Sequence, residues 1–297
     1  MNGTDGLVVV DKPSGWTSHQ VVGRVRRLLG TRKVGHGGTL DPMATGVLVI
    51  GVGRATRLLG HLAGRDKTYL ATIRLGQSTV TDDAEGEITD SPGAAGLDTD
   101  AIRAAIVPLS GTIKQVPSAV SAIKVDGKRA YARVRAGEDV VLKAREVTVR
   151  RFDILEVRHT ETDGLPVVDV DVKVDCSTGT YIRALARDLG AALGTGGHLT
   201  SLRRTRVGPW TLDDACPIGA DVDRVTLRSL DEVVPEAFTT VLVDEDFARD
   251  VRHGRRLRVR LDALSAILDQ DGTFLALYTP DGDTAVADAV FAPAQGG

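Results

Sequence analysis

The chain has few of the residues that define small secreted, zinc-binding or membrane proteins. Its 297 residues include only two cysteines, Cys176 and Cys216, and neither belongs to a CxxC pair. This spacing argues for reduced thiols and against a disulfide framework or a zinc site. No apolar run approaches the roughly 20 residues that cross a bilayer, and the first residues do not resemble a secretory signal. We therefore expect a cytoplasmic protein without a metal site or membrane contact.

Motifs for nucleotide cofactors are also scarce. A Walker sequence is absent, and residues 47–59 (VLVIGVGRATRLL) supply only part of the dinucleotide fingerprint G-x-G-x-x-G. Thr56 occupies the third glycine position, and no acidic residue follows at the required distance after a second strand. An enzyme that uses a nicotinamide or nucleotide cofactor therefore stays an alternative hypothesis. Tight binding of NAD would support it.

The small net charge of −3 conceals a strong segregation of charge along the chain. Residues 12–33 hold six Lys or Arg and residues 124–151 hold nine, whereas residues 82–100 hold seven Asp or Glu and no base. Such segregation allows a basic surface for a polyanion such as a nucleic acid. However, 29 of the 37 basic residues are arginine, a bias that codon usage alone can produce. Charge alone therefore does not decide between a surface that binds nucleic acid and an ordinary solvated surface.

Strand and helix patterns follow one another irregularly. Residues 167–176 alternate valines with charged residues, which predicts a strand with one wet face. Because regular βαβ spacing is absent, the pattern favours an α+β fold over a doubly wound sheet. We further expect strands at 6–11, 46–53 and 68–76, and helices at 18–30 (capped by Ser18), 54–63, 99–109 (capped by Thr99 or Asp100) and 180–194.

The composition changes near Pro235. Beyond it, short strand-like segments alternate with turn signals such as Asp281-Gly282. We therefore expect a main domain over residues 1–236 and a small β-rich domain over residues 237–297.

The stretch GHGGTLDPMATGVLVIGVG, residues 35–53, places six glycines around Asp41. Glycine permits sharp turns and close approach of the backbone to another group, so we expect these residues to let a nucleotide come near Asp41. Because Asp41 precedes Pro42, it also fits the ordinary start of a turn. A carboxylate shielded from water would need cationic companions to stay charged. Taken singly, the other candidate residues also have structural explanations: His36, Tyr69, Tyr181 and Arg183.

Four segments of the chain carry distinctive motifs, namely VVVDKPSGWTS (8–18), VGHGGTLDPMATGVL (34–48), DKTYLATIRLG (66–76) and CSTGTYIRALARDLG (176–190). Two weaker ones are SAIKVDGKRAYARVRAG (121–137) and GGHLTSLRRTRVG (196–208). Taken together and in this order, these segments resemble the bacterial TruB family of tRNA pseudouridine synthases. Two positions depart from the family pattern, because Gly37 stands in place of a threonine and Val120 in place of a tyrosine.

The resemblance implies the pseudouridine synthase fold, in which helices flank a mixed, largely antiparallel central sheet, followed by a small PUA-like RNA-binding domain. It implies that uridine 55 in the T loop of tRNA is isomerised to pseudouridine without a metal or an organic cofactor. The tRNA T arm would be the partner, no protein partner would be required, and we expect a monomer. An RNA-binding protein that folds tRNA, with catalysis incidental, is the alternative from a different class.

The resemblance also implies roles for individual residues. Asp41 aligns with the catalytic aspartate, Tyr69 with a tyrosine that lies against the target base, and Arg183 with the arginine paired to the aspartate. An insertion at about 112–140 aligns with the RNA-contacting segment called the thumb. Three chemical steps are possible for Asp41, namely attack on C1′, attack on C6 or removal of a sugar proton. The implied substrate-binding residues are Lys12, Pro13, His36, Lys124, Arg129, Tyr181 and Leu202.

Overall fold

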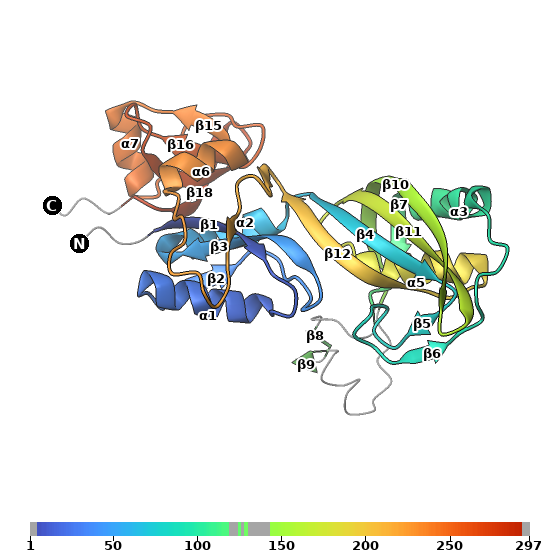
Figure 1. The fold of residues 1–297 in the computed structure, drawn as a ribbon. Helices are drawn as coiled ribbons and strands as arrows, with labels where there is room; N and C mark the ends of the chain where they lie inside the picture. Colours follow the sequence, from blue (N-terminus) through green and yellow to red (C-terminus); the bar gives the residue numbers. More distant parts are fainter. Residues whose placement is uncertain (1–4, 119–123, 126–127, 130–142, 293–297) are drawn as a thin grey trace.

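A ten-stranded sheet runs through the molecule, and a four-stranded sheet near the C-terminus lies beside one end of it (Figure 1). The structure is a computed structural model that describes residues 5–118, 124–125, 128–129 and 143–292. The large sheet comprises β1 (Gly6–Lys12), β2 (Val34–His36), β3 (Thr45–Val52), β4 (Lys67–Leu75), β7 (Gly111–Gln115), β10 (Arg145–Thr162), β11 (Leu165–Cys176), β12 (Gly197–Val207), β13 (Trp210–Thr211) and β14 (Cys216–Pro217).

The remaining strands form smaller sheets, and helices cover the sheet faces. The C-terminal sheet comprises β15 (Thr239–Leu242), β16 (Ser265–Leu268), β17 (Phe274–Asp281) and β18 (Thr284–Val290), and two hairpins pair β5 (Ser78–Thr79) with β6 (Ile88–Asp90) and β8 (Lys124–Val125) with β9 (Lys128–Arg129). The helices are α1 (Ser18–Leu29), η1 (Gly53–Leu58), α2 (Leu59–Ala63), α3 (Thr99–Ile106), η2 (Val107–Leu109), α5 (Ile182–Leu193), α6 (Leu230–Ala237) and α7 (Glu245–Arg252).

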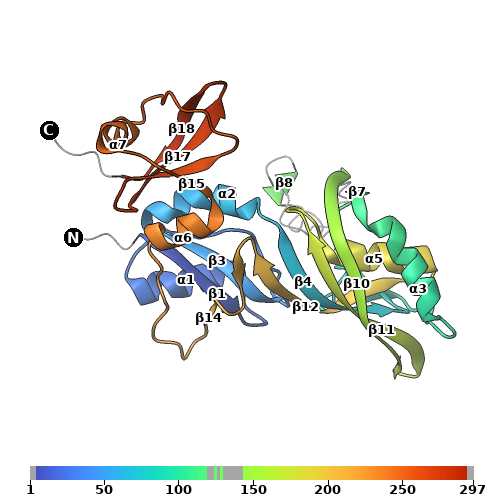
Figure 2. The ribbon, with the colours of Figure 1, turned by 90° about the horizontal axis from the view of Figure 1, so that it is seen from above.

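The strand order of the large sheet is β14-β1-β3-β12-β4-β11-β10-β7, with β2 beside β3 and β13 beside β12. Among its described pairs, β1–β14 and β3–β12 are parallel and the others are antiparallel. Helices α3 and α5 contact each other at the β10–β7 end, as both ribbon views show (Figures 1 and 2). The expected α+β class, with a mixed and largely antiparallel sheet flanked by helices, is confirmed.

The two halves of the large sheet meet at a short seam between β3 and β12. Only two residue pairs form it, Arg203 with Thr45 and Arg204 with Gly46. Gly46 has a φ of +103°, and a Cβ at this position would lie 2.1 Å from the carbonyl oxygen of Arg204. A residue with a side chain therefore cannot replace it without moving β12. At Gly46 the group that approaches the backbone is therefore a protein strand, whereas the expectation for the other glycines of this stretch stays a prediction.

The alternating strand was predicted well. Val168, Val170, Val172 and Val174 of β11 are fully buried. On the opposite face, Asp169 accepts two hydrogen bonds of 2.8 Å from Arg74 of the neighbouring strand β4. The valines therefore build the core while the charged face is satisfied between strands.

Helix starts lie one residue from the predicted caps. Thr17, rather than Ser18, caps α1 in a capping box with Gln20, and Asp98, rather than Thr99, caps α3. Ser18 instead turns inward, where its Oγ donates to the carbonyl of Leu40 at 3.1 Å and accepts from the Leu40 N–H at 2.9 Å. This pair of bonds ties the start of α1 to the loop that carries Asp41.

The partial dinucleotide fingerprint does not form the geometry that binds a dinucleotide. The residues after β3 fold into the 3-10 helix η1 and the five-residue α2, not the expected helix over 54–63. The next strand, β4, lies between β12 and β11 rather than parallel to β3. Because the fingerprint needs a βαβ unit, this segment is not a dinucleotide-binding motif.

The C-terminal sheet confirms the expected small β-rich unit, although α7 was not anticipated. Pro235, where the composition changes, lies inside α6. One hydrophobic cluster contains Leu7 of β1, Val234 of α6 and Leu277 of β17, so the two sheets share buried side chains. No helix among the described residues is long and apolar enough to cross a membrane.

Candidate active site

A pocket of about 260 Å³ opens beside the seam between the two halves of the sheet. Its volume is below the roughly 300–1,000 Å³ of pockets for drug-sized ligands, so it suits a group such as one nucleobase. Five of the residues singled out from the sequence line it together: Asp41, Tyr69, Tyr181, Arg183 and Leu202. They come from distant parts of the chain, namely the loop before β3, strand β4, the start of α5 and strand β12.

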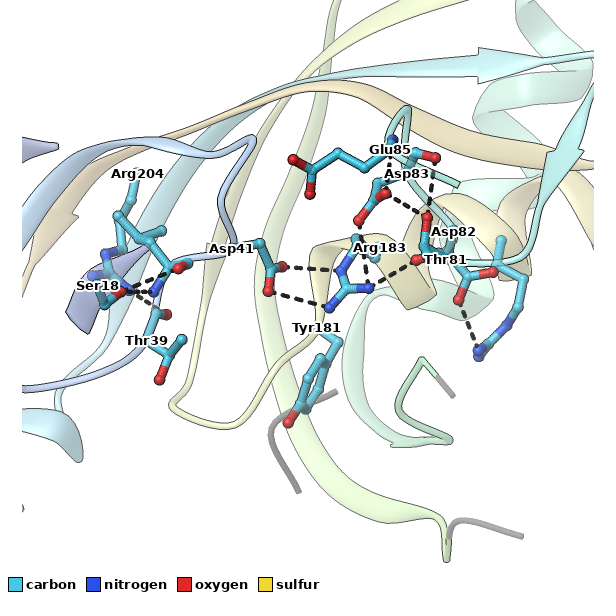
Figure 3. A network of polar contacts seen from close by, with 12 residues as sticks. Ser18, Thr39, Asp41, Thr81, Asp82, Asp83, Glu85, Tyr181, Arg183 and Arg204 are labelled. Atoms are coloured by element: carbon cyan, nitrogen blue, oxygen red, sulfur yellow. Dashed lines mark hydrogen bonds and ion pairs between the residues drawn. The ribbon is translucent and has the colours of Figure 1, made fainter. Parts of the chain in front are cut away.

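Asp41 and Arg183 form a two-pronged ion pair at the pocket wall (Figure 3). The Nε of Arg183 lies 3.0 Å from Oδ2 of Asp41, and Nη2 donates to Oδ1 at 3.3 Å. The Arg183 side chain is 5 % exposed, whereas that of Asp41 is 34 % exposed. A planar guanidinium in this arrangement fixes the orientation of a carboxylate as well as compensating its charge. Asp41 is thus oriented by Arg183 and open to the pocket.

The other edge of Arg183 is held by the loop between β5 and β6. Its Nη1 donates to the carbonyl oxygen of Thr81 at 2.8 Å and lies 3.4 Å from Oδ2 of Asp83. Asp83 is almost fully buried, and its carboxylate also accepts from the Glu85 N–H at 3.1 Å. Asp82, between these partners, adopts a left-handed φ of 59°, which turns Thr81 and Asp83 toward the same side.

Sequence reasoning missed Asp83. It lies in the acidic segment 82–100, which was interpreted only as an example of charge segregation. The available signal was the need of a buried arginine for counter-charges, because an unpaired buried charge is costly. Near this cluster, burial raises the pKa of Glu85, and the charges of Asp83 and Asp41 raise it further. Asp41, Asp83 and Glu85 therefore gather around the Arg183 guanidinium (Figure 3).

Lys12 lies beneath the loop that carries Asp41 rather than in the pocket. Its side chain is fully buried, and its Nζ donates to the carbonyls of Pro13 at 2.9 Å, Trp16 at 2.6 Å and Pro42 at 3.1 Å. Burial lowers the pKa of Lys12 to about 8, an effect that the charge of Asp41 opposes. Through these hydrogen bonds Lys12 joins the half-buried Pro13 to the turn that follows Asp41.

The opposite wall of the pocket is built from β4 and β12. Tyr69 is 6 % exposed, and burial raises its pKa, although the charge of Arg204 lowers it. The guanidinium of Arg204 donates to three backbone carbonyls, those of Val47 at 2.8 Å, Gly38 at 3.1 Å and Thr39 at 3.4 Å. These bonds draw the glycine-rich loop onto β12.

Lys67 completes this wall. Its Nζ donates to the carbonyls of Arg65 at 2.7 Å and Ala63 at 2.9 Å. Burial lowers the pKa of Lys67 to about 8, and the charge of Arg204 lowers it as well. Neither Lys67 nor Arg204 was singled out from the sequence, although each lies within a segment that resembles the family.

Of the other predicted residues, His36 is outside the pocket lining and Tyr181 is part of it. His36 ends β2, and its ring meets that of His19 edge-on at 5.4 Å between centroids. Tyr181 lines the pocket, and its ring extends away from the Asp41–Arg183 pair (Figure 3). The backbones of Lys124 and Arg129 pair in the β8–β9 hairpin, and much of the predicted insertion at about 112–140, including Val120, lies outside the described residues.

This fold defines a class of RNA-modifying proteins. The chain is similar to a solved H/ACA ribonucleoprotein bound to a substrate RNA containing 2′-deoxyuridine, with a TM-score of 0.72 and 25 % identity, over 98 % of this chain and 86 % of that one. It is equally similar to a Cbf5-Nop10-Gar1 complex, with a TM-score of 0.72 and 26 % identity, over 97 % of this chain and 85 % of that one. The architecture is therefore the pseudouridine synthase fold.

The chain belongs to the TruB family of pseudouridylate synthases. Residues 26–182 match the N-terminal domain of that family, residues 183–235 the C-terminal domain of tRNA pseudouridylate synthase B, and residues 238–292 the C-terminal region of tRNA pseudouridine synthase II. The tRNA pseudouridine synthase B of Arthrobacter sp. (strain FB24) is 55 % identical over 98 % of this chain and 97 % of its own length. That of Cutibacterium acnes is 58 % identical over 94 % of each chain.

Proposed function

We propose that this protein converts uridine 55 in the T loop of tRNA to pseudouridine, with Asp41 as the catalytic carboxylate. Its curated relatives are named tRNA pseudouridine synthase B, which supports tRNA as the substrate. The observation that carries the residue assignment is the two-pronged Asp41–Arg183 pair, which leaves Asp41 open to a pocket the size of a nucleobase. A tRNA substrate would place the reaction in the cytoplasm.

The proposed reaction moves one glycosidic bond. The bond between N1 and C1′ breaks, the base turns, and C5 bonds to C1′, while a proton leaves C5 and N1 ends with one. Atoms and electrons balance within the nucleotide, so the isomerisation requires no oxidant or reductant. Asp41 would act on C1′, on C6 or on a sugar proton, and each route requires a charged and oriented carboxylate.

A uridine inside folded RNA must first leave its stack. Extrusion costs a few kcal/mol of stacking and pairing. Stacking of a base on an aromatic ring is worth roughly 1–3 kcal/mol, so Tyr69 in the pocket wall would offset much of this cost. Because burial raises the pKa of Tyr69, we propose it as a neutral stacking surface in the free protein. Leu202 and Tyr181 would enclose the extruded base from the sides of the same pocket.

We propose the same division of the chain as the sequence suggests. Residues 1–236 would form the catalytic domain, with the insertion at about 112–140 as its RNA-contacting segment, and residues 237–297 would form the PUA-like RNA-binding domain. The match of residues 238–292 to a separate C-terminal family region supports this boundary. Lys124 and Arg129 would contribute phosphate contacts, which make affinity fall with salt.

Asp41→Asn tests the proposal. The amide keeps the size of the side chain but cannot attack, so tritium release from C5-labelled uridine in a T-arm RNA should fall more than about a thousandfold. Binding of the same RNA should persist. Asp153→Asn, on the outer strand β10 and 39 % exposed, is the matched control and should retain the wild-type rate. Substantial turnover by Asp41→Asn would refute the assignment, and tRNA refolding without tritium release by the wild type would favour the tRNA-folding alternative.

A further inference from the structure

Helix α5 carries Arg183 in its first turn, yet its N-terminus is not capped by its own residue. Tyr181 occupies the N-cap position with φ −101° and ψ 109°, and its side chain does not cap the helix. Tyrosine lacks the short oxygen-bearing side chain of Ser, Thr, Asp or Asn that normally fills this position. The first N–H groups of a helix have no partner within the helix, so the start of α5 must be fixed from elsewhere.

Gln115 supplies that fixing contact from the end of β7. Its Nε2 donates to the carbonyl of Tyr181 at 3.0 Å, and its Oε1 accepts from the Tyr181 N–H at 2.8 Å. The Gln115 residue is only 2 % exposed. A side-chain amide thus pairs with both polar groups of one backbone residue, as a neighbouring strand would. Both φ and ψ of the residue that starts α5 are held by this pair.

The position of Gln115 is itself set by the large sheet. Its backbone pairs with Arg145 of β10, so the amide projects from a fixed strand. A second contact ties the same segment to α5, because Arg187 donates to the carbonyl of Val116 at 2.8 Å. The end of β7 and the residue after it therefore hold α5 at the N-cap and again at Arg187, between one and two turns later.

We propose that Gln115 is a positioning residue for Arg183, acting through the backbone of Tyr181. This inference rests on the function proposed above. Arg183 is two residues from the paired backbone, and its guanidinium must meet Asp41 on one edge and Thr81 on the other. A displacement of about 1 Å at such a site can cost a hundredfold in rate. Gln115 touches no reacting atom, so its contribution is to the orientation of the ion pair.

Gln115→Glu provides a test with a signature that simple loss of packing does not produce. When ionised, the introduced carboxylate still accepts from the Tyr181 N–H but cannot donate to the Tyr181 carbonyl. When protonated, it recovers one donor and one acceptor in the same places. Burial raises the pKa of such a carboxyl group, so protonation becomes appreciable at mildly acid pH. The variant should therefore be slow at pH 8 and recover at pH 6.

The measurement is the single-turnover rate of tritium release from a saturating T-arm RNA, with the wild type at both pH values as reference. We expect Gln115→Glu to be at least about tenfold slower than the wild type at pH 8 and within about threefold of it at pH 6. Gln115→Met, which fills the space without polar atoms, should be slow at both pH values, while RNA affinity changes little.

Gln77→Glu is the matched control, because Gln77 is also a buried amide, 7 % exposed, but donates to Ser91 rather than to α5. It should show no rate change that reverses with pH. Wild-type rates for Gln115→Glu at pH 8, or equal loss in Gln115→Glu at both pH values, would overturn the inference. Failure of the wild type to release tritium would instead refute the proposed function, so the two failures are distinguishable.

Discussion

The two walls of the pocket both contain buried arginines, but they hold them in different ways. On the α5 side, Arg183 lies 3.0 Å from Asp41 and 3.4 Å from Asp83. On the β12 side, Arg204 is bound by three backbone carbonyls and forms no ion pair with any described residue. The first guanidinium has two counter-charges, and the second has only dipoles around it.

The difference shows that a buried cation can orient a group or set the local potential. A compensated guanidinium such as Arg183 adds little net charge but fixes the geometry of its carboxylates. The charge of Arg204 reaches its neighbours, where it lowers the pKa of both Lys67 and Tyr69. Charges act more strongly between buried groups than in water. One wall would therefore aim Asp41, and the other would attract an anionic substrate.

Substitution on the α5 wall should have the largest effect. Arg183→Lys keeps the charge but replaces the planar fork with a single ammonium group, which cannot contact Asp41, Thr81 and Asp83 together. The single-turnover rate should fall at least about a hundredfold, with RNA affinity nearly unchanged. Arg74→Lys is the control, because Arg74 forms a similar two-pronged pair with Asp169 away from the pocket. Equal rates for both variants would contradict the contrast between the walls.

The second counter-charge should matter less than the arginine itself. Asp83→Asn keeps the size of the side chain but removes one of the two carboxylates beside Arg183. Hydrogen bonds to charged groups are worth about 1.5–3 kcal/mol, so the rate should fall about ten- to a hundredfold. The check is the same rate measurement beside that of Asp169→Asn. An unaltered rate would mean that Asp41 and the Thr81 carbonyl suffice to orient Arg183.

On the β12 wall, the main effect should be on stability. Arg204→Lys keeps the cation but cannot reach all three carbonyls, and each buried polar group left unpaired costs about 1–3 kcal/mol. The free energy of unfolding, measured with urea, should fall by this amount. The turnover rate should fall less than in Arg183→Lys. A loss of rate equal to that of Arg183→Lys, without a loss of stability, would place both arginines in the same role.

The smallest effect should appear as a pH dependence of stability at Lys67. Burial lowers its pKa to about 8, below its value in the unfolded chain, so between these two values the unfolded state binds more protons. The contribution of Lys67 to stability should therefore rise with pH above about 8, by at most about 1.4 kcal/mol per pH unit. The difference in unfolding free energy between the wild type and Lys67→Met, measured at pH 7, 8 and 9, should grow. If this difference in unfolding free energy did not change with pH, the pKa of Lys67 would not be lowered by burial as described.

The sequence motifs predicted the pocket residues better than the contacts that hold them. The segments around Asp41, Tyr69 and Arg183 resemble a known family and do meet in one pocket. Asp83 was missed because its contact depends on the left-handed turn at Asp82, which sequence patterns do not specify. Gln115 has no local pattern at all, since its partner Tyr181 lies 66 residues away.

The same limit applies to the small errors in the fold. Both Thr17 and Ser18 are good N-cap residues, so spacing alone cannot choose between them. Ser18 is drawn inward by its bonds to Leu40, a tertiary contact. Likewise, the fully buried valines of β11 follow from a period of two, whereas the close approach at Gly46 depends on β12, more than 150 residues later.

The seam between β3 and β12 has a consequence for how activity can be lost. Asp41 comes from the half of the sheet that contains β1 and β3, and Arg183 from the half that contains β4 and β11. Asp41, the proposed catalytic carboxylate, and Arg183 therefore lie in two blocks of the sheet whose strand pairing is limited to two residue pairs. Any change that lets the blocks pivot by a small angle would misalign the pair while leaving each block folded, so inactivating substitutions can occur far from the substrate and escape detection in a melting curve.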